Sequence, residues 1–310
     1  MKRIVLVFLL CPLFAIAQDK LSEANYRVYS VKLGKEVTLN EIVNDMADHD
    51  VLFYGEEHND SVTHFLEKTI LQLLHAKYGA QVTLSMEMFE RDVQPVMNEY
   101  LKGFIKEKHF TKDARAWSNY RDYKPMVEFA KEKGLDVVCA NSPVRYNNLA
   151  GRKGEEELLK LPDESQEYFA PVPYDTATGD YYEKLTGLPQ HSAAVPKDTA
   201  KKATAPAMTG MGGFDMVVSQ SLWDATMAYS ISQYLKGHKG KKVMQVNGRF
   251  HSDEGFAAAT QLKHYRPKAK QLIISSGSDE AFPNIKWDDY KKDGDYIIMT
   301  DPKVPKTYKD

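Results

Sequence analysis

The sequence predicts an α/β fold with a mainly parallel sheet, helices on both faces and a helical cap insertion. Apolar runs of strand length alternate with stretches whose apolar residues recur at helical spacing. This alternation is typical of a parallel sheet covered by helices on both sides. One long region, residues 146–213, breaks the alternation. We expect this region to form the cap, near the carboxyl ends of the strands.

A short strand-like piece and six apolar runs are the expected strands, at 26–31, 51–54, 81–88, 135–140, 242–247, 272–275 and 296–299. The main helices are expected at 39–46, 62–78, 93–101, 124–133 and 214–235, with a last one ending near Tyr265. Thr38 and Glu41 form a capping box, and Asn59, Asp60 and Ser61 are suitable caps. Gly79 and Gly134 end the helices before them. Ser252 and Asp253 are expected to cap the last helix.

The insertion is expected to be helical at 155–161 and again at 163–169. A polar run rich in Ala, Lys, Thr and Pro follows these helices. Such a composition cannot bury enough apolar surface to order itself, so residues 191–213 are predicted to be a mobile loop.

The overall composition is that of a soluble globular protein, with 43% hydrophobic and 27% charged residues among 310. This length permits a large core. The formal net charge of −2 gives no support to nucleic-acid binding.

The N-terminus has the pattern of a secretory signal peptide. Lys2 and Arg3 precede an apolar stretch at 4–14, and Ala15-Ile16-Ala17 is a cleavage pattern. The stretch is too short to span a membrane. We therefore expect a signal peptide at 1–17, cleaved after Ala17, and a periplasmic or secreted domain at 18–310.

Cys11 lies within this signal, but Leu10 stands where a lipid-attachment cysteine requires a small residue, so lipid anchoring is not expected. Cleavage leaves Cys139 as the single cysteine, which excludes an intramolecular disulfide.

Two Gly-x-x-His strings follow predicted strands. Gly55 to His58 comes after the run 51–54, and Gly248 to His251 comes after the run 242–247. Ligands of open parallel sheets bind at the carboxyl ends of strands. The two histidines are therefore expected to meet across one pocket.

Glu56 and Glu57 lie beside His58, which is a plausible arrangement for a divalent metal or a general base. The alternative is that Glu56 caps a helix and His58 is a loop histidine bonded to backbone. His64 is the weaker candidate, expected near the helix start and facing solvent.

Glu87 lies in the apolar segment 84–89, where a carboxylate costs free energy unless it is paired or binds a ligand. It is therefore a candidate site residue, with a simple ion pair to Arg91 as the alternative.

Beside His251, Arg249 could bind a carboxylate or phosphate. Asn141 and Arg145 fall at the same edge of the sheet. Asp224, an acid in an apolar helix, is expected either to orient a histidine or to make a helix-packing hydrogen bond.

Several enzyme classes are disfavoured. The sequence contains no Gly-rich phosphate-binding string, no Gly-x-Ser-x-Gly nucleophile elbow and no Cys-x-x-Cys-His string for covalent haem attachment.

Taken together, residues 35–300 resemble the ChaN-like haem-binding uptake family, in the wider Tiki/TraB and erythromycin-esterase-like superfamily. The resemblance is carried by Asp50 to His58, Leu84 to Phe89, Ala140 to Arg145, Leu222 to Ala228 and Gly248 to His251. It implies an exported or lipid-anchored bacterial protein that binds haem for iron uptake. It also implies an α/β sheet with a helical subdomain.

On this resemblance, the cofactor is haem, and the residues expected to contact it are His58, Arg145, Tyr174, Arg249 and His251. The insertion tyrosines would supply a flat apolar surface and the two arginines would bind propionates. Partners would be haem or another small molecule, with outer-membrane uptake machinery and a homodimer as further expectations.

Some relatives in the superfamily are metal-dependent peptidases or esterases. The alternative function is therefore a metal-dependent hydrolase, in which Glu56, His58, Glu87 and His251 are both the catalytic residues and the ligands of Mn, Co or Zn.

Overall fold

The computed structural model describes residues 21–187, 209–210 and 213–308. The predicted signal peptide at 1–17 and most of the predicted loop at 191–213 lie outside the described residues. No helix in the described part of the chain is both long and apolar enough to cross a membrane.

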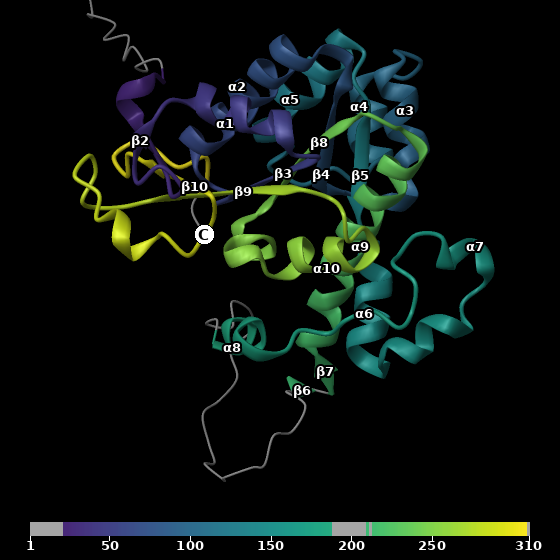
Figure 1. The fold of residues 1–310 in the computed structure, drawn as a ribbon. Helices are drawn as coiled ribbons and strands as arrows, with labels where there is room; N and C mark the ends of the chain where they lie inside the picture. Colours follow the sequence, from purple (N-terminus) through teal and green to yellow (C-terminus); the bar gives the residue numbers. More distant parts are fainter. Residues whose placement is uncertain (1–20, 188–208, 211–212, 309–310) are drawn as a thin grey trace, which may run out of the picture.

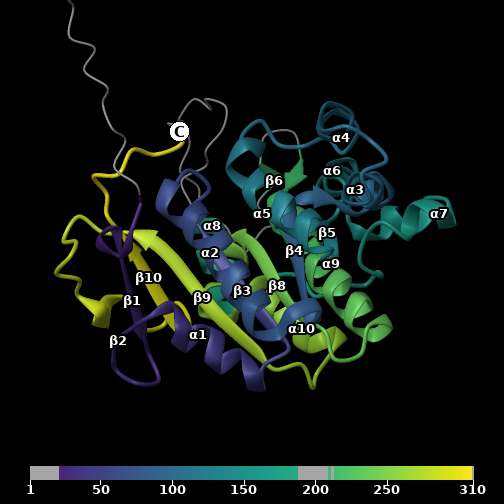
Figure 2. The same ribbon diagram turned by 90° about the horizontal axis from the view of Figure 1, so that it is seen from above.

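The main sheet has eight strands in the order β2-β1-β10-β9-β3-β8-β4-β5 (Figure 2). All strands from β10 to β5 are mutually parallel, while β1 and β2 add an antiparallel edge. The strands are β1 Tyr26–Ser30, β2 Lys35–Val37, β3 Val51–Glu56, β4 Val82–Glu90, β5 Val137–Asn141, β8 Lys242–Gly248, β9 Gln271–Ser278 and β10 Tyr296–Thr300. The predicted fold class is therefore confirmed.

Helices cover both faces of this sheet (Figure 1). One face carries α1 Leu39–Asp45, α2 Ser61–Tyr78, α3 Gln94–Leu101, α4 Glu107–Asp113 and α5 Tyr120–Lys133. The other face carries α9 Met216–Gly237 and α10 Ala257–Tyr265. The chain between β5 and α9 lies farther out on this second side. It contains α6 Val144–Lys153, α7 Asp163–Gln166, α8 Gly179–Gly187 and the small hairpin β6 Thr209–Gly210 and β7 Phe214–Asp215.

Alternate residues of the central strand β3 enter two separate cores. Leu52 and Tyr54 pack in the core under α2 and α5, whereas Val51 and Phe53 pack against α9 and α10. All four are fully buried. Successive strand residues point to opposite faces, so a strand covered on both sides must be apolar throughout, which explains its uninterrupted apolar run.

The caps of α2 form largely as predicted. The Asp60 side chain accepts hydrogen bonds from the backbone N–H groups of Val62 and Thr63. The helix ends at Gly79, whose φ of +57° is accessible to glycine at low cost.

The helix after His251 departs from the prediction, because it begins only at Ala257. Ser252 and Asp253 lie instead in short 3-10 turns, and Glu254 has a φ of +62°. The Asp253 carboxylate is bound to the Arg249 guanidinium at 2.8 Å rather than to a helix N-terminus. The sequence also gave no indication of α4, α8 or β2.

Replacing a core side chain of α2 tests this packing. Ile70→Ala removes three carbon atoms from the fully buried interface of α2 with the sheet, so we expect a loss of about 2–5 kcal/mol of unfolding free energy. Gln72→Ala, at an exposed position of the same helix, should change it by less than about 0.5 kcal/mol. Denaturant unfolding measures both, and equal losses would contradict this packing.

Candidate functional site

The two Gly-x-x-His turns lie side by side at the carboxyl ends of neighbouring strands. β3 and β8 are paired in parallel, with Glu56 opposite Gly248. His58 and His251 both line one pocket of about 640 Å³, a volume within the usual range for small-molecule sites. The pairing of these strands places both histidines at the edge of the sheet where parallel folds bind their ligands.

Each glycine of the pair makes room for the other turn. A Cβ on Gly55 would lie 2.8 Å from the Cα of Arg249, and a Cβ on Gly248 would lie 2.7 Å from Nε2 of His58. Neither separation is tolerated by a real side chain. The glycines are therefore required because the two turns pack directly against each other.

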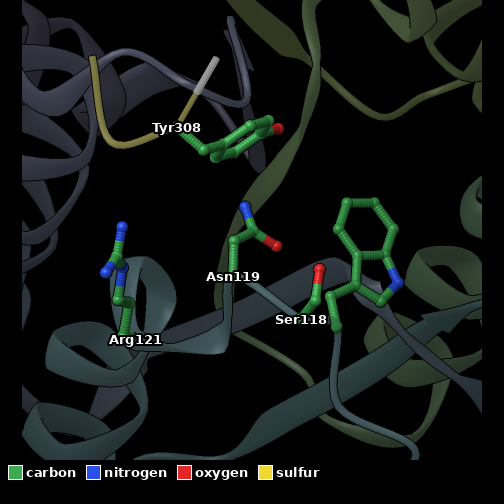
Figure 3. Close-up of a pocket in the computed structure, with 5 residues that line it drawn as sticks. Ser118, Asn119, Arg121 and Tyr308 are labelled. Atoms are coloured by element: carbon green, nitrogen blue, oxygen red, sulfur yellow. The ribbon is translucent and has the colours of Figure 1, made fainter. Parts of the chain in front are cut away.

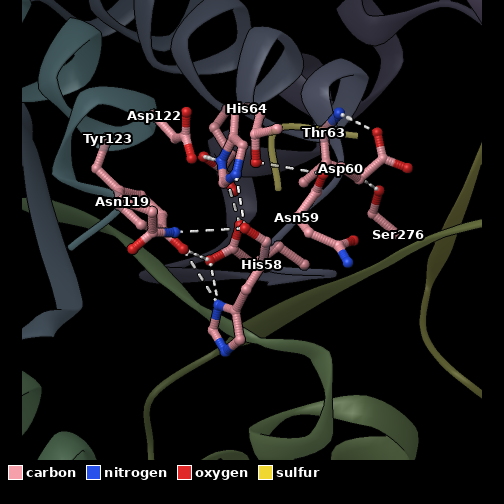
Figure 4. A network of polar contacts seen from close by, with 12 residues as sticks. His58, Asn59, Asp60, Thr63, His64, Asn119, Asp122, Tyr123 and Ser276 are labelled. Carbon is pink, nitrogen blue, oxygen red and sulfur yellow. Dashed lines mark hydrogen bonds and ion pairs between the residues drawn. The ribbon is translucent and has the colours of Figure 1, made fainter. Parts of the chain in front are cut away.

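His58 is held by a buried carboxylate behind it. Its Nδ1 lies 2.9 Å from Glu56 Oε1, which also accepts a hydrogen bond from the Tyr123 hydroxyl at 2.8 Å. Figure 4 shows the other ring nitrogen, Nε2, pointing away from this network. Burial lowers the pKa of His58, but the hydrogen bond and charge of Glu56 and the charge of Glu87 outweigh burial and raise it.

His64 does not face solvent, and that prediction is wrong. It is buried, and its Nδ1 lies 3.3 Å from Glu56 Oε2 and 3.1 Å from Glu67 Oε2. Burial lowers the pKa of His64, but Glu67 and Glu56 raise it to about 10. Burial and the Glu56 charge hold the pKa of Glu67 well above its usual range. Sequence reasoning missed Glu67, although its spacing of three residues from His64 places both on one face of α2.

His251 belongs to a second chain of polar contacts. Its Nδ1 lies 2.6 Å from Asp224 Oδ1, and its Nε2 lies 3.6 Å from Glu87 Oε1. Asp224 also accepts a hydrogen bond from the Tyr181 hydroxyl of α8 at 2.5 Å. Burial lowers the pKa of His251, but Glu87 and Asp224 outweigh it and raise the pKa to about 9. Asp224 thus orients a histidine, which was one of the two expectations.

Glu87 is fixed without Arg91. Its Oε2 accepts a hydrogen bond from the backbone N–H of Gly248 at 2.8 Å. Arg91 donates instead to the Ser230 hydroxyl and to the backbone oxygen of Glu167. The ion pair considered as the alternative for Glu87 therefore does not form.

Of the cationic and aromatic residues predicted to contact haem, Arg249 lies at the pocket, whereas Arg145 and Tyr174 do not. Arg249 lines the pocket, where it is paired with Asp253 and Asp293. Arg145 does not line it, because its guanidinium pairs with Asp92 and stacks on its neighbour Tyr146.

Tyr174 also lies outside the pocket. Its hydroxyl donates to the backbone oxygen of Val218, and its side chain lines a separate cavity of about 770 Å³. Of the other insertion tyrosines, Tyr181 reaches the site only through Asp224 and through its contact with the pocket residue Phe250.

The C-terminal segment contributes residues that no sequence pattern indicated. The Lys306 ammonium lies 3.2 Å from Glu57 and from Asp60, and the Thr307 N–H donates to the backbone oxygen of Asn59. These bonds tie the segment to the end of β3, where Lys306 and Tyr308 line the pocket.

A neighbouring pocket of about 560 Å³ shares Tyr308 (Figure 3). It is lined by Trp117, Ser118, Asn119, Arg121 and Tyr308. Trp117 also contacts the His58 ring edge-on, with 5.4 Å between ring centroids. Tyr308 and Trp117 thus connect the second pocket to the histidine site.

The four residues predicted as metal ligands share this edge of the sheet, but they do not form one compact set. In the described part of the chain, the group of acids and histidines whose ligand atoms all lie within 4.8 Å of one another is Glu56, His64 and Glu67. It includes only one residue of the predicted set.

Three solved structures are similar to this chain. ChaN of Campylobacter jejuni, described with cofacial haem binding, is similar to this chain with a TM-score of 0.62 and 15% identity, over 90% of this chain and 98% of that one. The type III effector HopBA1 has a TM-score of 0.43 and 12% identity, over 85% of this chain and 93% of its own. The RRSP effector domain of a Vibrio vulnificus MARTX toxin has a TM-score of 0.40 and 14% identity, over 77% of this chain and 36% of its own.

A comparison with curated proteins gives no match. The family model described as "Haem-binding uptake, Tiki superfamily, ChaN" matches residues 42–262, which is well over half of the chain and includes both Gly-x-x-His turns. The chain therefore belongs to the ChaN family of haem-binding uptake proteins, in the Tiki superfamily.

Proposed function

We propose that this protein binds haem through the pocket at the ends of β3 and β8 and serves haem uptake. Besides family membership, the proposal rests on how the His58 ring is bonded and directed. Its Nδ1 is bonded to Glu56, and its Nε2 is directed away from the buried network. A histidine that binds a metal ion or haem iron typically donates its other ring N–H to a carboxylate, which fixes the ring and makes it more basic.

The surroundings of His58 offer aromatic surface to a flat ligand. Trp117, Phe250 and Tyr308 supply this surface at or beside the pocket. Lys306 and Arg249 also line the pocket, but each is paired with two carboxylates, so a propionate would have to share or replace those partners. Bound haem would supply the iron centre, and these side chains would contact its ring and propionates.

The same proposal includes export through the N-terminal segment and delivery of haem to or from outer-membrane uptake machinery. The similar Campylobacter protein is described as binding haem cofacially. We therefore also propose that haem is held between two copies of this chain. Sedimentation with and without haemin tests this, because a monomer in both conditions would contradict it.

The first test removes the proposed iron ligand. Loss of a residue that only orients a metal ligand typically lowers affinity by about 10–100-fold. Loss of the ligand itself should cost at least as much, so we expect His58→Ala to weaken haemin binding by about 100-fold or more. His238→Ala, at an exposed histidine at the end of α9, should leave the affinity unchanged. Titration followed at the Soret band measures both, and equal haemin affinity in the two variants would exclude His58 as the ligand.

The second test moves His58 without removing it. Gly248→Ala places a methyl group 2.7 Å from Nε2 of His58, so the imidazole must shift and haemin affinity should fall by about tenfold. Gly237→Ala is the matched control, because a Cβ there meets nothing within 4 Å. Affinity retained in Gly248→Ala would show that the position of the imidazole is unimportant.

A second candidate function, the metal-dependent hydrolase, is favoured by one specific observation. The imidazole of His251 lies between the carboxylates of Asp224 and Glu87, and Tyr181 donates a hydrogen bond to Asp224. General acid–base catalysis requires an imidazole held in this way. The predicted metal ligands Glu56, His58, Glu87 and His251 do not form one compact set in the described part of the chain, so the acid–base chemistry of this candidate rests on His251 and its two carboxylates.

The effect of Asp224 on the pKa of His251 can be measured directly. Asp224→Asn removes one of the charges that raise its pKa to about 9, so the pKa should fall toward the usual value of about 6.5. Tyr181→Phe removes only the hydrogen bond to Asp224 and should cause a smaller change. NMR of the imidazole C–H signals follows the titration, and an unchanged midpoint in Asp224→Asn would contradict the role of Asp224.

A further inference from the structure

A cluster of three buried ionisable side chains lies behind His58, and one of them, Glu56, also lines the pocket. It consists of Glu56 at the end of β3 and of His64 and Glu67 on α2. Glu56 and Glu67 are almost completely buried and His64 is 7% exposed. One oxygen of each carboxylate and Nδ1 of the histidine all lie within 4.8 Å of one another.

Other hydrogen bonds of His64 and Glu56 turn their remaining polar atoms toward the centre of the cluster. Nε2 of His64 lies 3.1 Å from the backbone oxygen of His58, so Nδ1 faces the carboxylates. Glu56 Oε1 already accepts from Tyr123 and His58, which leaves Oε2 for the cluster. This arrangement, one ring nitrogen on a backbone oxygen and the other turned to the centre, is the usual one for a histidine that binds a metal ion.

Two buried carboxylate oxygens of the cluster, Glu56 Oε2 and Glu67 Oε1, have no hydrogen-bond partner in the described part of the chain. Glu56 Oε2 faces the His64 ring at 3.3 Å as an ion pair. Unpaired buried polar groups are costly and require a partner, which is either a bound ion or a proton shared by the two carboxyl groups.

The spacing of the ligand atoms fits an ion. Zinc binds histidine nitrogen and carboxylate oxygen at about 2.0–2.2 Å, so ligand atoms around a tetrahedral ion lie about 3.3–3.6 Å apart. Nδ1 of His64 lies 3.3 Å from Glu56 Oε2 and 3.1 Å from Glu67 Oε2. Two carboxylates and a divalent cation are also neutral together, which a buried site favours.

We propose that Glu56, His64 and Glu67 bind one divalent transition-metal ion, of which zinc is the best match to the donor set. The ion would lie in the buried layer between α2 and the sheet, where three protein ligands leave the fourth position of a tetrahedral zinc ion to a further ligand. Glu56 then contacts the ion through one oxygen and His58 through the other. The site differs from the hydrolase site of the second candidate function, since it uses neither Glu87 nor His251, and it does not depend on haem binding.

The test is zinc binding by the full chain after removal of metal with a chelator. Calorimetry and elemental analysis should find about one zinc per chain. At a hundred times the dissociation constant, zinc should raise the melting temperature by about 5 °C. Glu67→Gln keeps the size of the side chain but removes a ligand, so its zinc affinity should fall by about 100-fold. Glu99→Gln, at an exposed position of α3, is the matched control and should bind zinc as the unchanged protein does.

His64→Gln provides a second variant in case Glu67→Gln fails to fold, and it should also lose zinc. No zinc uptake by the unchanged protein, together with a normally folded Glu67→Gln, would overturn the proposal and assign the cluster to a shared proton. Loss of zinc in Glu87→Gln but not in Glu67→Gln would place the ion in the pocket instead. Haemin titration of the metal-free protein is a separate measurement, so failure of either proposal can be recognised without the other.

Discussion

The direct contact between the two Gly-x-x-His turns is the constraint on which the site depends. β8 lies between β3 and β4 in the sheet although it comes later in the chain, and its parallel pairing brings the two turns to the same level. The backbone at Arg249 then covers Gly55, and His58 covers Gly248. A side chain at Gly55 would meet the Arg249 backbone and force the ends of β3 and β8 apart, whereas a side chain at Gly248 would displace the His58 ring. The two glycines of the repeat are thus needed for the packing of the turns, whatever chemistry the histidines perform.

The two histidines are supported from opposite sides of the sheet. His58 is held through Glu56 by Tyr123 of α5, and His64 and Glu67 of α2 lie behind that carboxylate. These residues belong to the helical layer on one face. His251 is held by Asp224 of α9, which is in turn bonded to α8. The site is therefore the place where two otherwise separate cores are joined by polar contacts, and a displacement of either helical layer would move one histidine relative to the other.

Much of the fold could be predicted, because strands buried on both faces are apolar throughout and the helices between them have a clear period. The meeting of Gly55 to His58 with Gly248 to His251 followed from the same reasoning. The positions of Arg145 and Tyr174 did not. Arg145 lies at the start of α6 and Tyr174 in the chain between α7 and α8. Their partners, Asp92 and Val218, are distant in sequence, so no periodic pattern specifies these contacts. The contribution of Lys306 and Tyr308 likewise depends on long-range bonds to Glu57, Asp60 and Asn59.

The difference in exposure between the two histidines decides which one a ligand meets. The side chain of His58 is 35% exposed, whereas that of His251 is 8% exposed and lies between Asp224 and Glu87. Both rings line the pocket, but Nε2 of His251 lies 3.6 Å from Glu87, which is itself fixed by the backbone of Gly248. The arrangement around His251 therefore suits a small polar group or a proton, while His58 suits direct ligation. In the two functions proposed above, haem binding would therefore use His58, and acid–base chemistry would use His251.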